Sequence, residues 1–164
     1  MASCNLRCEI TEFFDRQVLQ QQWQQLVSNA DASAFLSEQW LSSWLLLIDD
    51  FQQPELIRVF DGQQLVALGL LHHTTLRRRG VFRRRVLYLN ELPVAGYQMV
   101  IEYNGLLVKR GAECAAWQAL LIFLAKRSGW DEFHLNCLAP SLSTILSEPL
   151  LDTSGFERIV AKSE

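Results

Sequence analysis

The chain has 164 residues, of which 49% are hydrophobic and 20% charged, and its formal net charge is -3. This length suits a single domain, residues 1–164, with a sizeable core, and the composition excludes an intrinsically disordered chain. The longest early apolar run, Trp44–Ile48, is far too short to span a bilayer, and no secretory signal pattern opens the chain. We therefore expect a cytoplasmic protein without membrane insertion.

The first third of the chain predicts a strand followed by two helices. Loosely alternating residues 6–14 give way to Asp15, a suitable N-cap for a Gln-rich helix that runs to about Val27. Ser37 can cap a second helix, in which apolar residues from position 40 to position 48 recur at helical spacing.

Beyond Pro54 the pattern changes to the period of two that is typical of strands. Residues 55–60 and a long strand from Leu65 are predicted to form a hairpin through the Asp61-Gly62 turn, because such a turn needs positive φ. A third strand, "VFRRRVLYL", follows. These three strands are predicted to form an antiparallel meander.

The remainder of the chain predicts a strand–helix–strand unit. "LPVAGYQ" is interpreted as a loop and "MVIEYNGLLV" as a fourth buried strand. A helix over about residues 112–127 and the strand "WDEFHLNCL" come next, which predicts a parallel, right-handed crossover. The final "GFERIVAK" is a candidate for one more strand. The fold class is therefore α/β, a mixed sheet flanked by helices in the order β-α-α-β-β-β-β-α-β.

Cysteine and histidine do not predict a metal site. The four cysteines form no CxxC pair, and we interpret them as free thiols in a reducing compartment. His72 and His73 are neighbours in a predicted strand, so their side chains point to opposite faces, and no further metal ligand lies at suitable spacing. His73 is a candidate for lining a substrate-binding cleft.

Six arginines crowd into residues 77–79 and 83–85, at one end of the meander. Arginine suits bidentate contacts with phosphates or carboxylates, so Arg77 and Arg79 are candidates for binding substrate. A sheet edge kept soluble by charge explains the same cluster. Because no interleaved aromatic residues or nucleic-acid motif accompany it, we expect no nucleic-acid partner.

The element order, with two helices after the first strand, resembles the GNAT acyltransferase fold. More narrowly, "FLSEQWLSSW", the hairpin "LIRVFDGQQLVALGLL", the Arg-rich strands and "IEYNGLLV" resemble the N-terminal half of CelD-like (cellulose-biosynthesis-type) and FemAB-like acetyltransferases. The resemblance covers about residues 34–138. Members of that group contain two GNAT-like halves, with acyl-donor chemistry usually assigned to the second.

The turn before the long helix is where the GNAT resemblance implies that the pyrophosphate of acyl-CoA binds, at a loop resembling Q/R-x-x-G-x-G/A. Lys109, Arg110 and Gly111 are the candidates for this contact. Read from Arg110, the sequence "RGAECA" places Glu113 where the first glycine of that loop should be. The alternative is structural: Gly111 ends the strand and Glu113 interacts favourably with the helix dipole. We therefore expect acetyl-CoA or another acyl-CoA to be bound mainly by a missing second half.

Three polar residues, Glu102, Tyr103 and Asn104, interrupt the fourth strand where the GNAT resemblance implies that strands splay apart. Glu102 is a candidate general base for an amine acceptor, and Tyr103 a candidate acid for the leaving thiolate. Asn104 is a candidate for binding substrate. The alternative is that strand alternation turns Glu102 and Asn104 outward, or into a turn before Gly105.

The resemblance implies an acyltransferase domain that takes part in transferring an acyl group from CoA or a carrier to an amine or hydroxyl of a saccharide or peptide, and that lacks donor chemistry when alone. The alternative is a non-catalytic GNAT-like module that binds an acceptor. In either case the expected protein partner is a second GNAT-like domain or a second copy of the chain.

Overall fold

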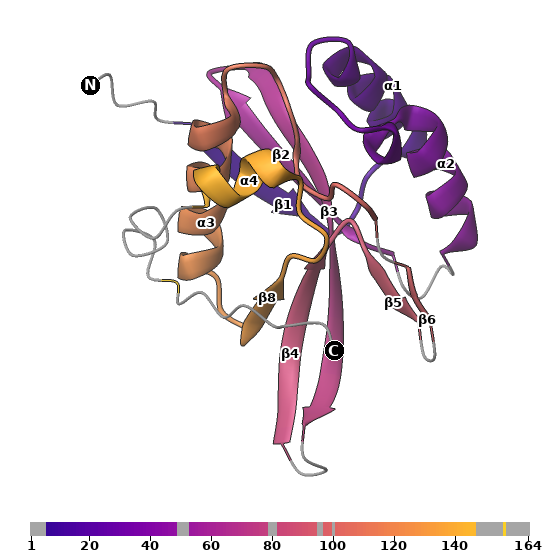
Figure 1. Cartoon of the computed structure of the whole chain (residues 1–164), viewed down its shortest axis with the longest axis vertical. Helices are drawn as coiled ribbons and strands as arrows, with labels where there is room; N and C mark the ends of the chain where they lie inside the picture. Colours follow the sequence, from indigo (N-terminus) through magenta and orange to yellow (C-terminus); the bar gives the residue numbers. More distant parts are fainter. Residues whose placement is uncertain are drawn as a thin grey trace.

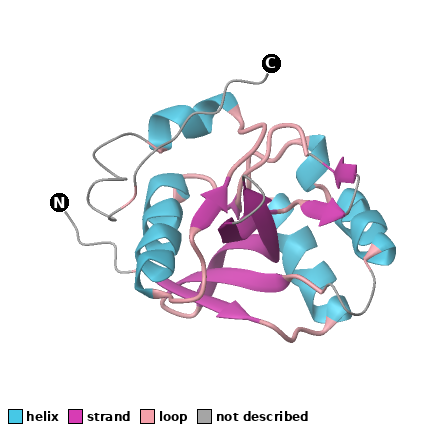
Figure 2. Ribbon diagram, turned by 90° about the horizontal axis from the view of Figure 1, so that it is seen from below, coloured by secondary structure: helices cyan, strands magenta, loops and turns pink. Residues whose placement is uncertain are grey.

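A computed structural model describes residues 6–48, 53–78, 82–94, 97–99, 101–146 and 156. One mixed sheet stands between two helical layers (Figures 1 and 2). The elements in chain order are β1 (Arg7–Thr11), α1 (Arg16–Val27), η1 (Ala34–Leu36), α2 (Glu38–Leu47), β2 (Glu55–Asp61), β3 (Gln64–Arg78), β4 (Phe82–Leu89), β5 (Leu92–Val94), β6 (Tyr97–Met99), β7 (Leu107–Val108), α3 (Glu113–Lys126), β8 (Glu132–His134) and α4 (Pro140–Ile145). Across these ranges, no helix combines the length and apolar character that a membrane span requires.

Both N-terminal helices begin where the sequence predicts. The Asp15 carboxylate caps α1 by accepting the N–H groups of Gln17 and Val18, at 2.7 and 3.1 Å. The Ser37 hydroxyl caps α2 by accepting the N–H of Trp40 at 3.3 Å. Each cap satisfies amides that have no acceptor inside the helix, and a cap of this kind is worth about 1 kcal/mol.

The predicted antiparallel meander is confirmed within a sheet of order β1-β2-β3-β4-β8. Gly62 makes the turn between β2 and β3 with φ of +59°, a conformation that favours glycine. Alternate residues of these strands face opposite layers. Leu56 and Leu70 pack with α1 and α2, whereas Ile57 and Leu71 pack with α3.

The fourth strand is much shorter than predicted, and its position differs. Of the described residues in "MVIEYNGLLV", Met99 ends β6 and Leu107–Val108 form β7. β7 pairs antiparallel with residues 67–68 of β3, along the edge that β4 occupies at residues 71–78. Because β3 is 15 residues long, both β4 and β7 can pair with it, one after the other along the same edge. The segment "LPVAGYQ" was wrongly predicted as a loop, since it contains the paired strands β5 and β6.

The predicted strand–helix–strand order is present as β7, α3 and β8, but β8 pairs parallel with β4 and not with β7. The parallel contact of the predicted fourth strand is a single bridge between Asn104 and Leu138. The described chain then continues to α4, which lies beside α3 in Figure 1. The predicted final strand "GFERIVAK" lies outside the described residues except for Phe156, whose ring stacks on Trp130 with centroids 5.6 Å apart.

Candidate functional site

A cleft of about 720 Å³ opens where two parallel segments of the sheet separate. β8 pairs in parallel with β4. Beyond β8, Leu138 forms a parallel bridge with Asn104, which belongs to a separate segment of the chain. Beyond that bridge one segment continues into β7 and the other turns into α4. The cleft therefore lies at the carboxyl ends of parallel strands, where ligands commonly bind in open α/β sheets.

Four parts of the chain line this cleft. They are the loop after α1, the approach to β7, the first two turns of α3 and the beginning of α4, and their lining residues include 31–33, 103–106, Glu113, Trp117 and 139–142. These parts are separated in the sequence by up to about 110 positions, so only the completed sheet brings them together.

Asn104 lies at the floor of the cleft and is fully buried, with 0% of its surface exposed. Its Nδ2 donates to the Leu89 carbonyl at 2.8 Å and to the Glu91 carboxylate at 3.1 Å. Its Oδ1 accepts from the Asn90 amide at 3.2 Å, and Asn136 donates to the other Glu91 oxygen at 2.7 Å. This buried network joins the end of β4 to the approach to β7.

Strained backbone is concentrated around the same junction. Among the described residues, the non-glycine positions with positive φ are Asn90, Tyr103 and Cys137, at 50°, 55° and 47°. Left-handed backbone costs a non-glycine residue free energy, and it persists where the surrounding contacts over-determine it. Here the Asn104 N–H donates to the Cys137 carbonyl at 2.9 Å, which fixes two of the three strained segments to each other.

The three residues of "EYN", which were predicted to be catalytic or to bind substrate, do not all line the cleft. Tyr103 lines the cleft and is 53% exposed, and Asn104 forms part of the floor. Glu102 is exposed and is not among the lining residues. The alternation that would turn Asn104 outward is absent, because Glu102 and Tyr103 form a turn before Gly105 and Asn104 makes an isolated parallel bridge to Leu138. The catalytic roles of Glu102 and Tyr103 stay predictions.

The predicted phosphate-binding turn leads into α3 at one end of the cleft. Gly111 has φ of +85°, and its N–H donates to the Glu113 carboxylate at 3.0 Å. The Arg110 guanidinium donates twice to Asp31, at 2.8 and 2.9 Å, and Lys109 donates to Gln64 at 3.1 Å. The Arg110 side chain holds the pKa of Asp31 below its usual range by hydrogen bonding and by charge. The turn that the resemblance implies is therefore present, but the side chains of Lys109 and Arg110 and the Gly111 N–H already bind other groups of the chain.

Two buried polar atoms at the cleft have no hydrogen-bond partner among the described residues. They are the Nε1 of Trp117, a residue with 0% exposure, and the Oγ of Ser33. Leaving a buried donor unpaired costs about 1–3 kcal/mol, so orphaned polar atoms need a physical reason. Both atoms lie beneath the surface of the cleft, so a ligand in the cleft does not reach them without movement of the surrounding groups. Trp117 lies on the apolar face of α3, and the missing partner of its indole has no signal in the sequence.

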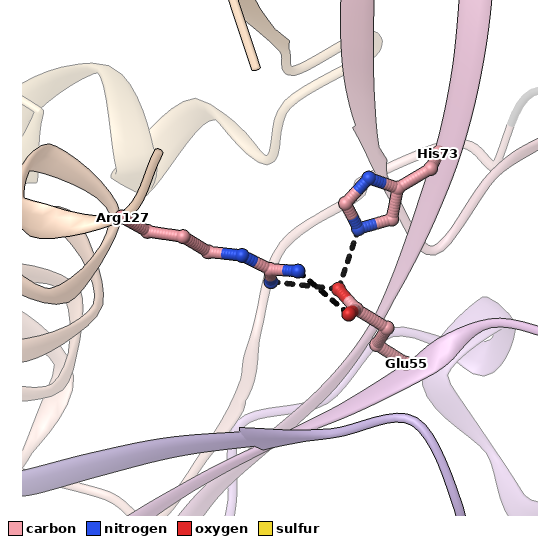
Figure 3. Close-up of polar contacts among 3 residues, drawn as sticks. All are labelled: Glu55, His73 and Arg127. Atoms are coloured by element: carbon pink, nitrogen blue, oxygen red, sulfur yellow. Dashed lines mark hydrogen bonds and ion pairs between the residues drawn. The ribbon is translucent and has the colours of Figure 1, made fainter. Parts of the chain in front are cut away.

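His73, a predicted substrate-binding residue, lies outside the cleft in a cluster with Glu55 and Arg127 (Figure 3). Its Nε2 is 2.5 Å from a Glu55 oxygen, and Arg127 donates to both Glu55 oxygens at 2.7 Å. Burial opposes ionisation of Glu55. The hydrogen bonds from His73 and Arg127 outweigh that effect and lower the pKa of Glu55 to about 2. The cluster ties β2 and β3 to the C-terminal end of α3.

The two predicted arginines also lie away from the cleft. Arg77 is exposed and stands opposite Arg83 in the β3–β4 ribbon, which projects from the body of the protein in Figure 1. Arg79 lies outside the described residues. The structure therefore places Tyr103 and Asn104 at the cleft, whereas Lys109, Arg110 and Gly111 are not among its lining residues. His73 and Arg77 also lie elsewhere.

Within the described ranges, no group of three or more His, Cys, Asp or Glu residues is arranged to hold a metal ion. His72 and His73 lie on opposite faces of β3, as predicted. His72 is buried, and burial lowers its pKa to about 4. Cys8, Cys114 and Cys137 are free thiols, and Cys4 lies outside the described residues.

Comparison with known proteins supports the fold. No protein-family model and no curated protein matches the chain. Among solved structures, it is similar to the aminoglycoside N-acetyltransferase AAC(6')-Iy in complex with CoA, with a TM-score of 0.50 and 12% sequence identity over 100% of this chain and 99% of that chain. A likeness at this identity shows the fold alone. The chain therefore has the GNAT-like fold that its sequence predicts.

Proposed function

We propose that this chain is an acyltransferase domain that takes an acyl group from a thioester donor, carried by CoA or by another carrier, and transfers it to an amine or hydroxyl of a saccharide or peptide. The observation that carries the proposal is the cleft at the carboxyl ends of the parallel segments, which Tyr103 and Asn104 line. The GNAT-like fold supports it, and the neighbour of that fold was solved in complex with CoA.

The chemistry requires a base, an acid and a fixed position for the thioester. The acceptor nitrogen or oxygen attacks the thioester carbonyl and gives up a proton, the carbon–sulfur bond breaks, and the thiolate takes a proton. Tyr103 lines the cleft and is the proposed acid. Glu102 is the proposed base; it is exposed and precedes Tyr103 in the chain, so we propose that the acceptor approaches from this side. Asn104 fixes the floor.

The closer kinship, to the N-terminal half of a CelD-like or FemAB-like protein, is part of this proposal and rests on the sequence patterns in residues 34–138. One observation favours the alternative of a non-catalytic GNAT-like module. The Glu113 carboxylate lies at the turn where the resemblance implies that a donor pyrophosphate binds. The two possibilities differ in whether a thioester enters the cleft.

We expect S-acetyl-pantetheine or acetyl-CoA, titrated separately to millimolar concentration, to shift the amide resonances of Gly105 and Leu106 in nitrogen-15 correlation spectra. Both residues line the cleft, so their shifts locate the ligand there. Adenosine 3′,5′-bisphosphate, which lacks the thioester arm, is the control and is expected to leave these resonances in place. If neither thioester moves them, the acyltransferase proposal fails and the non-catalytic module stands.

A further inference from the structure

The outer part of the β3–β4 ribbon, residues 73–78 and 82–85, carries two facing arginines that the described chain leaves without partners. Figure 1 shows this ribbon extending beyond the rest of the sheet. Arg77 on β3 is the register partner of Arg83 on β4, and both are exposed. Neither makes a hydrogen bond or an ion pair with another described residue. Two cations therefore stand side by side at the surface without a counter-charge from the described chain.

The hydrogen bonds of Arg85 show how the backbone of the ribbon is oriented. Its N–H donates to the Asp131 carboxylate at 2.8 Å and its carbonyl accepts the Asp131 N–H at 2.8 Å, so both groups face away from β3. This orientation alternates along an antiparallel pair, so the backbone groups of Arg83 also face away from β3, and those of Arg77 face away from β4. The two arginines thus form a non-hydrogen-bonded pair, the kind in which opposite side chains lie closer.

Facing arginines in this arrangement lower the stability of the ribbon, because like charges directly opposite each other in a sheet repel. A charged edge also keeps a sheet from pairing with other sheets, and that role explains why arginines lie here. It does not require two of them to share one face at the closer kind of pair. An anion that contacts both arginines offsets the repulsion.

Carboxylates of the chain itself already bind the inner end of the same face. Alternate strand residues share a face, so His73 and Arg85 lie on the same side as the two facing arginines. Glu55, the first residue of β2, contacts the His73 ring at 2.5 Å, and Asp131, the residue before β8, accepts from the Arg85 guanidinium at 3.2 Å. On both strands the basic residue nearer the body has a carboxylate partner from a neighbouring strand, and the outer one has none.

The edge of β3 beside these arginines is open among the described residues. β2 pairs with β3 as far as Glu55 opposite Leu71. Beyond that point, Thr75 and Arg77 direct their N–H and carbonyl groups to an edge that no described strand covers. An unpaired edge of this kind can take an extended peptide as an added strand. Such a strand would continue the row of β2, in which Glu55 already places a carboxylate on this face.

The charge of the whole chain favours a short partner segment over a long polyanion. The chain has 18 Asp and Glu residues and 15 Lys and Arg residues, and six of those 15 are the arginines of residues 77–79 and 83–85. Nine basic residues therefore remain elsewhere against 18 acidic ones. A nucleic acid that runs past the ribbon meets this excess of negative charge, whereas a short acidic segment stays on the ribbon.

We propose that the outer edge of β3 is a docking site for an extended acidic segment of a partner protein. The segment pairs with the N–H and carbonyl groups of Thr75 and Arg77 and places alternate carboxylates on Arg77 and Arg83. Backbone pairing supplies affinity, and the arginines select acidic side chains. This docking edge lies away from the cleft, so it does not depend on the acyltransferase proposal.

The test uses a short labelled peptide of alternating glutamate and threonine, which in extended form presents all its carboxylates on one side. Fluorescence anisotropy measures its dissociation constant for the wild-type chain and three variants. We expect Arg77→Gln and Arg83→Gln each to weaken binding about fivefold, the effect of one well-aligned ion pair at the surface. Arg84→Gln is the matched control. It removes the same charge from the opposite face of the ribbon, and it should change the affinity less than about twofold.

Nitrogen-15 correlation spectra locate the bound peptide. We expect the Thr75 and Arg77 amides to shift and to exchange hydrogen more slowly, while the resonances of Gly105 and Leu106 in the cleft stay in place. A peptide of the same composition with its glutamates in one block is expected to bind about fivefold more weakly, because an extended strand then divides the carboxylates between both faces. The spectra and the peptide comparison use the wild-type chain alone, and circular dichroism verifies that each variant is folded.

Several results would overturn this assignment. One is an alternating peptide that does not bind the wild type at millimolar concentration, or that moves the cleft resonances and not those of Thr75 and Arg77. Another is an equal loss of affinity for Arg84→Gln and Arg83→Gln, or a single-stranded oligonucleotide of the same charge that binds as tightly as the peptide, since either shows a general attraction for anions. Self-association of the wild type that Arg83→Gln abolishes would assign the edge to a second copy instead.

Discussion

Replacing Asn104 with leucine is expected to lower the free energy of unfolding by about 3–4 kcal/mol, because it removes a fully buried amide whose partners stay behind. The Leu89 carbonyl, the Glu91 carboxylate and the Asn90 amide would each lose a hydrogen bond in the interior. Leucine has the same branched skeleton of side-chain heavy atoms as asparagine with bulkier methyl groups, so the change leaves no cavity and tests the loss of the polar network. Urea unfolding at pH 7 measures the loss.

Asn136→Leu is the matched control for this network. Asn136 is only partly buried and donates one hydrogen bond to the same Glu91 carboxylate, so its loss should cost about 1 kcal/mol. If the two substitutions lower the free energy of unfolding equally, the burial of Asn104 does not add to the stability that its hydrogen bonds provide. A cost below about 1 kcal/mol for Asn104→Leu would contradict the prediction, since it would mean that other groups or water replace the lost bonds.

The parts of the fold that could be predicted from the sequence depend on local signals. Asp15 and Ser37 cap helices through amides two or three positions away, and Gly62 makes a two-residue turn. Such contacts are set by neighbouring residues, so spacing alone identifies them. The succession of β7, α3 and β8 was predictable from the changes of period along the chain, whereas the parallel partner of β8, which is β4, was not.

The end-to-end arrangement of β4 and β7 could not be predicted from local pattern. It depends on the length of β3 and on Asn90, which leaves the strand direction with φ of 50° and bonds both the N–H and the carbonyl of Leu70. Asparagine tolerates left-handed backbone, but the sequence "YLNELP" gives no indication of whether this one adopts it.

The candidate site was predictable in part for a similar reason. "EYN" was identified because polar residues interrupt an apolar strand, and the structure places Tyr103 and Asn104 at the cleft. Trp117 falls on an apolar helical face and is indeed buried, yet whether its Nε1 has a partner depends on atoms far away in the chain. Hydrogen-bond satisfaction is a property of the whole fold, so no spacing rule reveals it.

His73 shows the same limit, because its partner Glu55 is 18 positions away and Arg127 is 72 positions from Glu55.

Replacing Arg127 with leucine is expected to destabilise the protein by about 2–3 kcal/mol at pH 7, since it leaves the Glu55 carboxylate, only 10% exposed, with one of its two partners. The measurement is urea unfolding of the variant and the wild type across pH 7 to 3.

The pH dependence separates an ionic role from simple packing. The pKa of Glu55 is about 2 in the folded protein, below its ordinary value of 4.5, so the unfolded chain binds more protons between these values. The stability that Glu55 contributes is therefore complete above pH 4.5 and is lost as the pH falls towards 2. The destabilisation caused by Arg127→Leu should disappear over the same interval, because a protonated Glu55 needs no cation. The Glu55→Gln variant has no ionisable group at this position, so its free energy of unfolding should not show this dependence on pH. An equal cost for Arg127→Leu at pH 7 and pH 3 would instead assign Arg127 a packing role through its aliphatic stem.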